Sequence, residues 1–347
     1  MAIQSEFSKK YIVDMEEKLP LIIDAFCQEF GEKYREVIEQ RIENIRVAFA
    51  GVQYDLLSST FANNRTITWE ERDKIYDLCA EAGKKNKEYL NESAKAFLKQ
   101  SLEDVPDIYF ESLYDYIDAE SGKTMGTCSH IPSYDYSKIY QVALYKLCKL
   151  TDDLIVHEIT HAFSSTCDNP LADIYFMRSG FMSYQAGGGS HFIDLEEFVR
   201  QEKISCFNEL VTEYLTKEIC QNLKDKNLEI YNNRDSCRSC YRTSLVIFKP
   251  ILDLIKPTLV KAYMENDLSL VQKLFSESDF KNLIDLNYDL LENVDLTFYH
   301  HNLSEQEYKD AILSMDKKPP DTDPRHFAYD AFEFTKSLAL NLEIDKK

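Results

Sequence analysis

The feature that most constrains this chain is the pattern His-Glu-x-x-His at His157, Glu158 and His161. On an α-helix, residues four apart stand one above the other on the same face, so the two imidazoles can reach one metal ion. Glu158 follows the first histidine and lies near that face, within reach of a water molecule at the metal. Zinc suits this arrangement because it accepts neutral imidazole nitrogen and carboxylate oxygen in a tetrahedral site. The motif therefore predicts a helix that carries two ligands of one zinc ion.

The residues around the motif support a helix. Thr151, Asp152 and Asp153 form a natural helix start, and the residues that follow them are apolar enough for a buried helix. The alternative is a core helix whose two histidines are hydrogen-bonded and bind no metal. A catalytic zinc also needs a third protein ligand and an open position for water, so the third ligand has to be sought elsewhere in the chain.

The third ligand is expected at residues 207–215, which have a helical pattern and carry two glutamates four apart, Glu209 and Glu213. His-Glu-x-x-His followed by Asn-Glu-x-x-Thr-Glu resembles the gluzincins, the thermolysin-like class of zinc metallopeptidases. The resemblance implies one zinc ion per chain, with His157, His161 and Glu209 as its ligands. It also implies that Glu213 holds a ligand histidine by its other ring nitrogen. The carboxylates that compete for the role of third ligand are Glu196, Glu197, Glu202 and Glu213.

The same residues predict the hydrolysis of peptide bonds. A bound zinc lowers the pKa of its water toward about 7 and polarises a peptide carbonyl. Glu158 is expected to take the proton from the attacking water and to pass it to the leaving nitrogen. The tetrahedral intermediate carries an oxyanion, which gluzincins usually stabilise with a tyrosine or a histidine. Tyr241 is our candidate for this donor, and the alternatives are Tyr184, His191, His300 and His301.

Composition limits the class of protein and its partners. The apolar fraction of 44% is that of an ordinary globular protein. The formal net charge of −20 argues against a nucleic-acid partner, because no basic patch is evident to meet phosphates. No apolar run approaches the roughly twenty residues of a membrane span. We therefore expect a peptide or protein substrate, no nucleic acid and no membrane.

Cysteine usage and the start of the chain bear on the compartment. The nine cysteines are odd in number and have no framework spacing, and residues 1–30 lack the features of a secretory signal. Both observations favour reduced thiols in the cytoplasm. Export by a signal-independent route, as for a toxin or an effector, is compatible with the same observations. Cys237 and Cys240 form a lone Cys-x-x-Cys pair without two further ligands nearby, so we expect free thiols there.

Hydrophobic periodicity predicts three regions, which can also form one compact unit. Residues 1–103 and 231–347 are expected to be helical, and residues 104–230 to form a catalytic core with strands and helices, an α+β fold. In the first region, one helix is expected after Pro20 and another is expected to start at Thr68, where Thr-Trp-Glu-Glu is a capping box.

Within the expected core, strands are predicted near Phe110 and at residues 124–131, 138–145 and 178–184. The gluzincin resemblance implies a zincin-like core, in which a small mixed sheet lies with the two helices that carry the motifs. It also implies an edge strand that pairs with the bound peptide backbone. Residues 124–131 and 138–145 are the two candidates for that edge.

Other functions stay open at this point. The zinc site can belong to a toxin-like protease with one protein target, or to an aminopeptidase, although the Gly-x-Met-Glu-Asn-type stretch expected of the latter is missing. It can also belong to a non-enzymatic binding module in which zinc has a structural role. Glu158 argues against the binding module, because a purely structural site has no use for a base at that position.

Overall fold

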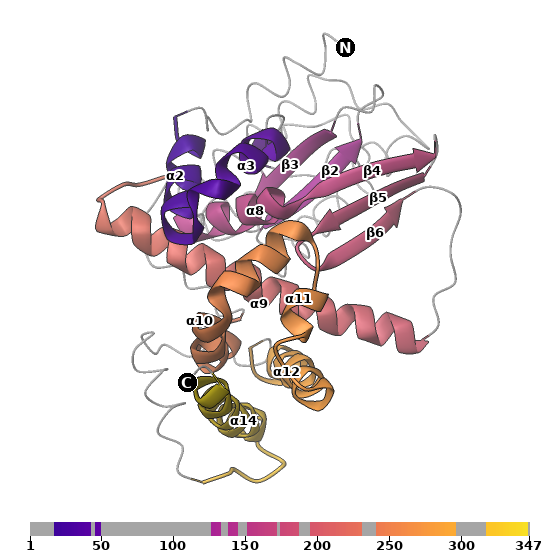
Figure 1. The fold of residues 1–347 in the computed structure, drawn as a ribbon, viewed down its shortest axis with the longest axis vertical. Coiled ribbons are helices and arrows are strands. Elements are labelled where there is room, and N and C mark those ends of the chain that lie inside the picture. Colours follow the sequence, from indigo (N-terminus) through magenta and orange to yellow (C-terminus); the bar gives the residue numbers. More distant parts are fainter. Residues whose placement is uncertain are drawn as a thin grey trace, which may run out of the picture. The chain divides into compact units, whose positions relative to one another are not determined.

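A computed structural model gives the fold of the chain (Figure 1). The residues that it describes are 17–42, 46–49, 126–132, 138–144, 151–171, 174–186, 195–230, 241–295 and 317–345. Most of them are helical and the others include two small sheets, so the fold belongs to the α+β class. The predicted helix from Thr68, the predicted strand near Phe110 and the pair of Cys237 and Cys240 lie outside the described residues.

The chain divides into two units, each assembled from segments that are distant in the sequence. The first unit comprises Met1–Ala25, Ile42–Ala162 and Leu223–Ser236, and the second comprises Phe26–Arg41, Phe163–Asn222 and Cys237–Lys347. Among the helices that the structure describes, none has both the length and the apolar character needed to cross a membrane.

The first unit contains a three-stranded mixed sheet. Its strands are β1 (Arg46–Phe49), β2 (Gly126–Pro132) and β3 (Lys138–Leu144), in the order β1-β3-β2. β3 pairs with β1 in parallel and with β2 in antiparallel orientation, with Val142 opposite both Val47 and Cys128. The strands predicted at residues 124–131 and 138–145 are therefore present, each within two residues of the predicted ends.

Helix α8 (Asp152–Ser164) carries the His-Glu-x-x-His motif. Its first turn is held by the two aspartates of the predicted helix start. Asp153 Oδ1 accepts a hydrogen bond of 3.0 Å from the following backbone N–H, and Asp152 Oδ2 accepts one of 3.0 Å from the N–H of Ile230. Carboxylates at this end also complement the positive pole of the helix dipole. The predicted start of the helix is confirmed.

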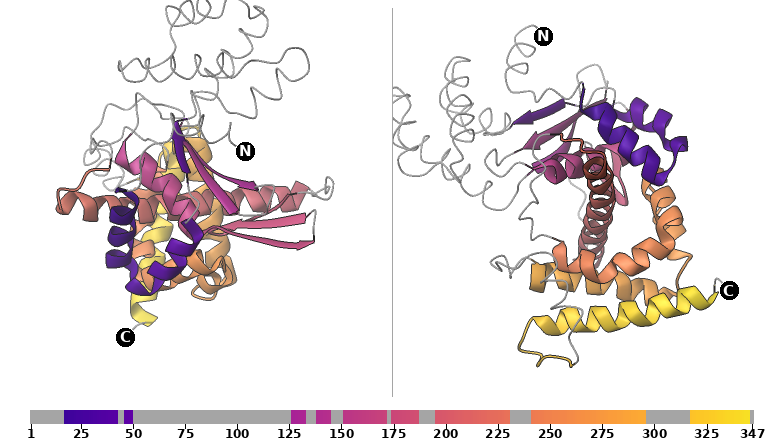
Figure 2. Two further views of the ribbon diagram at one scale, coloured as in Figure 1. Left: turned by 90° about the horizontal axis from the view of Figure 1, so that it is seen from above. Right: turned by 90° about the vertical axis from the view of Figure 1, so that its left-hand side faces the viewer.

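The second unit contains an antiparallel sheet and most of the helices. The sheet has the order β4-β5-β6, with β4 (Thr166–Leu171), β5 (Ile174–Ser179) and β6 (Met182–Ala186). The long α9 (Leu195–Asp225) follows it. The later helices α10 (Arg242–Glu265), α12 (Glu277–Leu290) and α14 (Arg325–Asp345) pack on one another, as Figure 2 shows. Further helices are α2 (Leu19–Phe30), α3 (Arg35–Ile42) and α11 (Ser269–Gln272).

The prediction of a single strand at residues 178–184 is wrong, because the chain reverses its direction within this range. β5 ends at Ser179 and β6 begins at Met182, and the two strands pair antiparallel with Ser179 opposite Met182. Gly180 makes the reversal with a φ of +55°, a left-handed conformation that favours glycine. A lone glycine in an apolar pattern was the local signal of this turn.

Apolar side chains from distant segments form the core of the second unit. Phe26 of α2 packs edge-on against Phe163 of α8, with ring centroids 5.4 Å apart. On α9, Phe207 is fully buried and stacks on Phe181, with centroids 5.7 Å apart. Phe181 also meets Tyr263 of α10 edge-on at 5.8 Å. Such pairs add to the free energy gained by burying the rings.

Arg41 caps two helices at once, which leads to a prediction about stability. From α3, its guanidinium donates to the carbonyl of Phe163 at 2.8 Å and to the carbonyl of Met264 at 3.0 Å, near the C-terminal ends of α8 and α10. A cation at these ends also complements the helix dipoles. We expect Arg41→Ala to lower the free energy of unfolding by about 2 kcal/mol, measured by chemical denaturation.

The matched control for this prediction is Arg35→Ala on the same helix. Arg35 pairs with the exposed Glu32 at 2.6 Å, and a surface ion pair of this kind contributes at most about 1 kcal/mol. Equal losses in the two variants would contradict the capping role of Arg41.

Candidate metal centre

Helix α8 places the two histidines of the motif side by side. The ring centroids of His157 and His161 are 4.9 Å apart, and the ring planes cross at 77°. The two side chains are only 2% and 8% exposed. Their helical neighbours Ile159 and Ala162 are fully buried, as the apolar pattern of the segment predicts. The histidines therefore form a pair on a helix that is buried along its whole length.

Helix α9 supplies the third side chain. The ligand atoms of His157, His161 and Glu209 all lie within 4.8 Å of one another. This is the one group of three His, Cys, Asp or Glu side chains in the described part of the chain that is placed to hold a metal ion. The competing carboxylates Glu196, Glu197 and Glu202 lie on the same helix and do not join the group. The structure thus brings together the three residues that the sequence named as ligands.

The donor set of this group fits a zinc ion. Two imidazole nitrogens and one carboxylate oxygen are the ligands of many catalytic zinc sites. In a tetrahedral site with bonds of about 2.1 Å, ligand atoms are about 3.4 Å apart. The ligand atoms here lie within 4.8 Å of one another, so the three side chains converge on one small space. Three protein ligands also leave the fourth position open for water.

The surroundings of Glu209 are electrically negative. Cys206 stands one helical turn before Glu209 on α9, and burial raises the pKa of its thiol to about 12. The nearby charges of Glu292, Glu209 and Glu202 contribute to this rise in the pKa. The thiol is therefore protonated at neutral pH. The same negative potential favours a cation beside Glu209.

Glu158 is buried beside the first histidine. Its side chain is 6% exposed and it stands in the same helical turn as His157. In the following turn, the hydroxyl of Thr160 donates to the carbonyl of Val156 at 2.7 Å and stays within the helix. Glu158 and Thr160 are the two polar residues between the histidines. Of these, Glu158 is the one whose side chain offers a carboxylate for proton transfer.

Glu213 and Tyr241 keep their predicted roles as hypotheses. Glu213 is buried one turn after Glu209 on α9, and its carboxylate lies 3.7 Å from the ammonium of Lys217. Tyr241 directly precedes α10 in a left-handed conformation with a φ of +65°. The contact of Glu213 with a ligand histidine and the role of Tyr241 at an oxyanion stay predictions. Of the alternatives to Tyr241, Tyr184 lies in β6, and His191, His300 and His301 lie outside the described residues.

The motif around Glu209 also contains residues that fix α9 in the second unit. Thr212 is fully buried, and its hydroxyl donates to the carbonyl of Asn208 at 2.9 Å. The same oxygen lies 2.8 Å from the hydroxyl of Tyr263 on α10. Sequence reasoning assigned no role to Asn208 or Thr212. The available signal was that both are polar residues at positions where the helix pattern is apolar.

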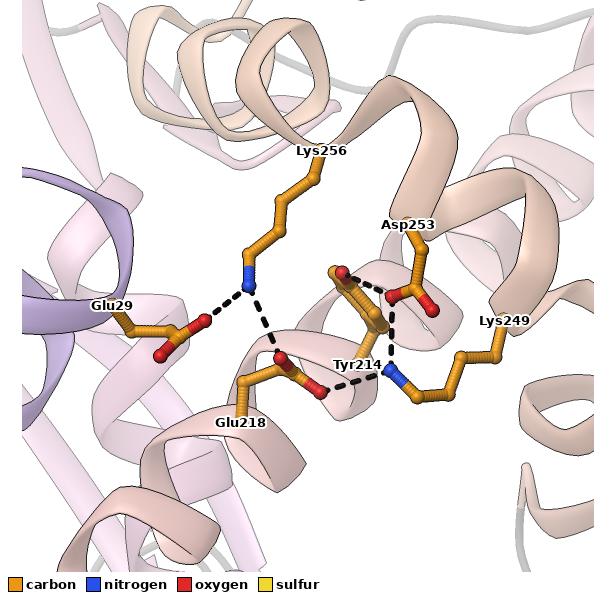
Figure 3. Close-up of polar contacts among 6 residues, drawn as sticks. All are labelled: Glu29, Tyr214, Glu218, Lys249, Asp253 and Lys256. Atoms are coloured by element: carbon orange, nitrogen blue, oxygen red, sulfur yellow. Dashed lines mark hydrogen bonds and ion pairs between the residues drawn. The ribbon is translucent and has the colours of Figure 1, made fainter. Parts of the chain in front are cut away.

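Further along α9, a network of charged groups joins it to α2 and α10 (Figure 3). Glu218 accepts from Lys256 at 3.1 Å and from Lys249 at 3.0 Å, and Lys256 also contacts Glu29 of α2. Lys249 and the hydroxyl of Tyr214 both donate to Asp253, at 2.9 Å and 2.8 Å. Burial and the hydrogen bond to Asp253 hold the pKa of Tyr214 well above its usual value. Each partner is satisfied within the network, which therefore holds α9 in place and offers no free ligand position.

Comparison with models of protein families, with curated proteins and with solved structures finds no match for this chain. The metal centre is therefore inferred from the residues of the chain and from their geometry.

Proposed function

We propose that this protein is a zinc-dependent metallopeptidase of the gluzincin type, which hydrolyses peptide bonds of a peptide or protein substrate. The observation that carries the proposal is the approach of the ligand atoms of His157, His161 and Glu209 to within 4.8 Å. Two of these residues belong to one helix and the third comes from a helix much later in the chain. The cluster therefore unites the ligand types of a catalytic zinc site from two separate helices.

The residues of the site divide the proposed chemistry among them. His157, His161 and Glu209 hold the zinc, which supplies Lewis-acid activation of water and of the substrate carbonyl when it is bound. Glu158 accepts the proton of the attacking water and returns it to the leaving nitrogen. Glu213 orients a ligand histidine, and Tyr241 donates a hydrogen bond to the oxyanion.

The proposal includes a zincin-like core made of the mixed sheet with α8 and α9. β3 lies between β1 and β2 in this sheet, so it is not an edge. Of the two strands considered for the substrate-binding edge, β2 alone has one side without a partner among the described strands. We therefore propose that β2 pairs with the backbone of the bound peptide.

The first test is the metal content of protein purified without added metal. We expect about one zinc per chain by elemental analysis, because two buried histidines and a half-buried glutamate that leave one position open bind this ion tightly. Removal of zinc with a chelator is expected to abolish cleavage of a peptide library, and added zinc to restore it. Protein that binds no metal after zinc is supplied at neutral pH would refute the proposal.

A further inference from the structure

The turn between β5 and β6 contacts both helices that carry the proposed ligands. The N–H of Gly180 donates to Ser164 Oγ at 2.7 Å, and the N–H of Phe181 donates to Asn208 Oδ1 at 2.8 Å. Ser164 is the last residue of α8, and Asn208 directly precedes Glu209 on α9. Two consecutive backbone N–H groups thus bind one side chain from each helix. The N–H groups that bind Ser164 and Asn208 therefore belong to neighbouring residues, and the turn fixes the distance between the two side chains.

Gly180 allows the turn to approach α9 more closely than any other residue can. A Cβ atom at this position would lie 2.0 Å from Asn208 Oδ1 and 2.5 Å from the ring of Tyr263. Both distances are far below van der Waals contact. A side chain at position 180 would therefore displace Asn208, even if the backbone kept its left-handed conformation.

Asn266, which follows α10, connects the turn to α8 a second time. Its Nδ2 donates to the carbonyl of Ser164 at 2.8 Å and to the carbonyl of Gly180 at 2.9 Å. Its Oδ1 lies 3.2 Å from the hydroxyl of Thr166, which donates to it. One amide group thus holds the end of α8 and the turn together.

The two side chains that the turn binds, Ser164 and Asn208, are shielded from water. Ser164 is fully buried and Asn208 is 2% exposed. Hydrogen bonds in such surroundings do not compete with water, and a donor or acceptor left without its partner is costly there. The turn therefore resists small changes in the spacing of its two contact points.

We propose that Asn208 and Ser164 are positioning residues, which use the β5–β6 turn to hold α8 and α9 at the spacing that lets Glu209 share a metal ion with the two histidines. This inference rests on the proposed zinc site. Asn208 is adjacent to Glu209, so a displacement of Asn208 moves the carboxylate directly. Metal sites require ligands held within about 0.5 Å of their working geometry.

Asn208→Leu tests the proposal, because leucine has nearly the shape of asparagine and accepts no hydrogen bond. We expect a 10- to 100-fold weaker zinc affinity, measured by competition with a chelating dye, and an altered visible spectrum of the cobalt-substituted protein. Asn208→Asp keeps an oxygen that accepts from Phe181, so it is expected to retain the wild-type spectrum. The matched control is Asn287→Leu, because Asn287 is 1% exposed, lies on α12 and has an Nδ2 without a hydrogen-bond partner. Its zinc affinity is expected to stay unchanged.

The outcomes separate this inference from the proposed function. A wild-type protein that binds no zinc overturns the function itself. A wild-type protein that binds zinc, together with an Asn208→Leu variant of equal affinity and equal cobalt spectrum, overturns only the positioning role. If Asn208→Leu does not fold, Ser164→Ala decides, because it removes one hydroxyl at the other contact point. We expect this variant to weaken zinc binding in the same direction, and unchanged binding overturns the inference.

Discussion

Replacement of Glu158 by glutamine is expected to lower kcat/KM for peptide hydrolysis by about 10²- to 10⁴-fold and to leave the zinc content unchanged. Glutamine keeps the shape of the side chain and its capacity for hydrogen bonds, but it cannot take a proton from the attacking water. Glu158 is buried beside His157 and is not one of the three clustered side chains. The substitution therefore removes the base and spares the proposed ligands.

The measurement combines elemental analysis with peptide cleavage on the same preparation. Glu196→Gln is the matched control, because Glu196 is an exposed glutamate in the first turn of α9, outside the metal cluster. Its activity and zinc content are expected to equal those of the wild type. Wild-type activity in Glu158→Gln would exclude the proposed mechanism. Zinc-loaded wild-type protein that cleaves no peptide would instead support the alternative of a non-enzymatic binding module.

The parts of this fold that the sequence predicted are those with local signals. The start of α8 is encoded in Asp152 and Asp153, and the apolar run behind them predicts a buried helix. β2 and β3 follow from runs of alternating and β-branched residues. Glu209 could be predicted as a ligand because the two motifs together resemble a known class. Helical periodicity alone does not predict that two distant helices bring these residues together.

The parts that the sequence did not predict depend on contacts between distant residues. The sequence pattern predicts one strand where the structure has the hairpin of β5 and β6, because its reversal at Gly180 is stabilised by Asn208 on α9 and by Asn266 just after α10. No local pattern reports that Arg41 caps the ends of two helices. Such hydrogen bonds are decided by tertiary packing, to which residue propensities contribute little.

The second large effect is expected from His157→Ala, which should reduce the zinc content from about one per chain to below a tenth of that value. The variant leaves only His161 and Glu209 as ligands, and two ligands do not complete a zinc site that needs three from the protein. His157 is 2% exposed, so water reaches the vacated space poorly and does not replace the imidazole without cost. The zinc content is measured by elemental analysis after dialysis against metal-free buffer.

A thermal readout distinguishes the loss of a ligand from general damage to the fold. A metal that binds only the folded state raises its stability by about 4 kcal/mol at a thousandfold excess over Kd, so the Tm of the wild type should rise with added zinc. The Tm of His157→Ala should not respond. His326→Ala is the control, because His326 lies on α14, where its Nδ1 is 2.8 Å from the carbonyl of Asp323 and outside the metal cluster. A His157→Ala variant that keeps both its zinc and its thermal response would place the metal elsewhere and return the two histidines to the role of core residues.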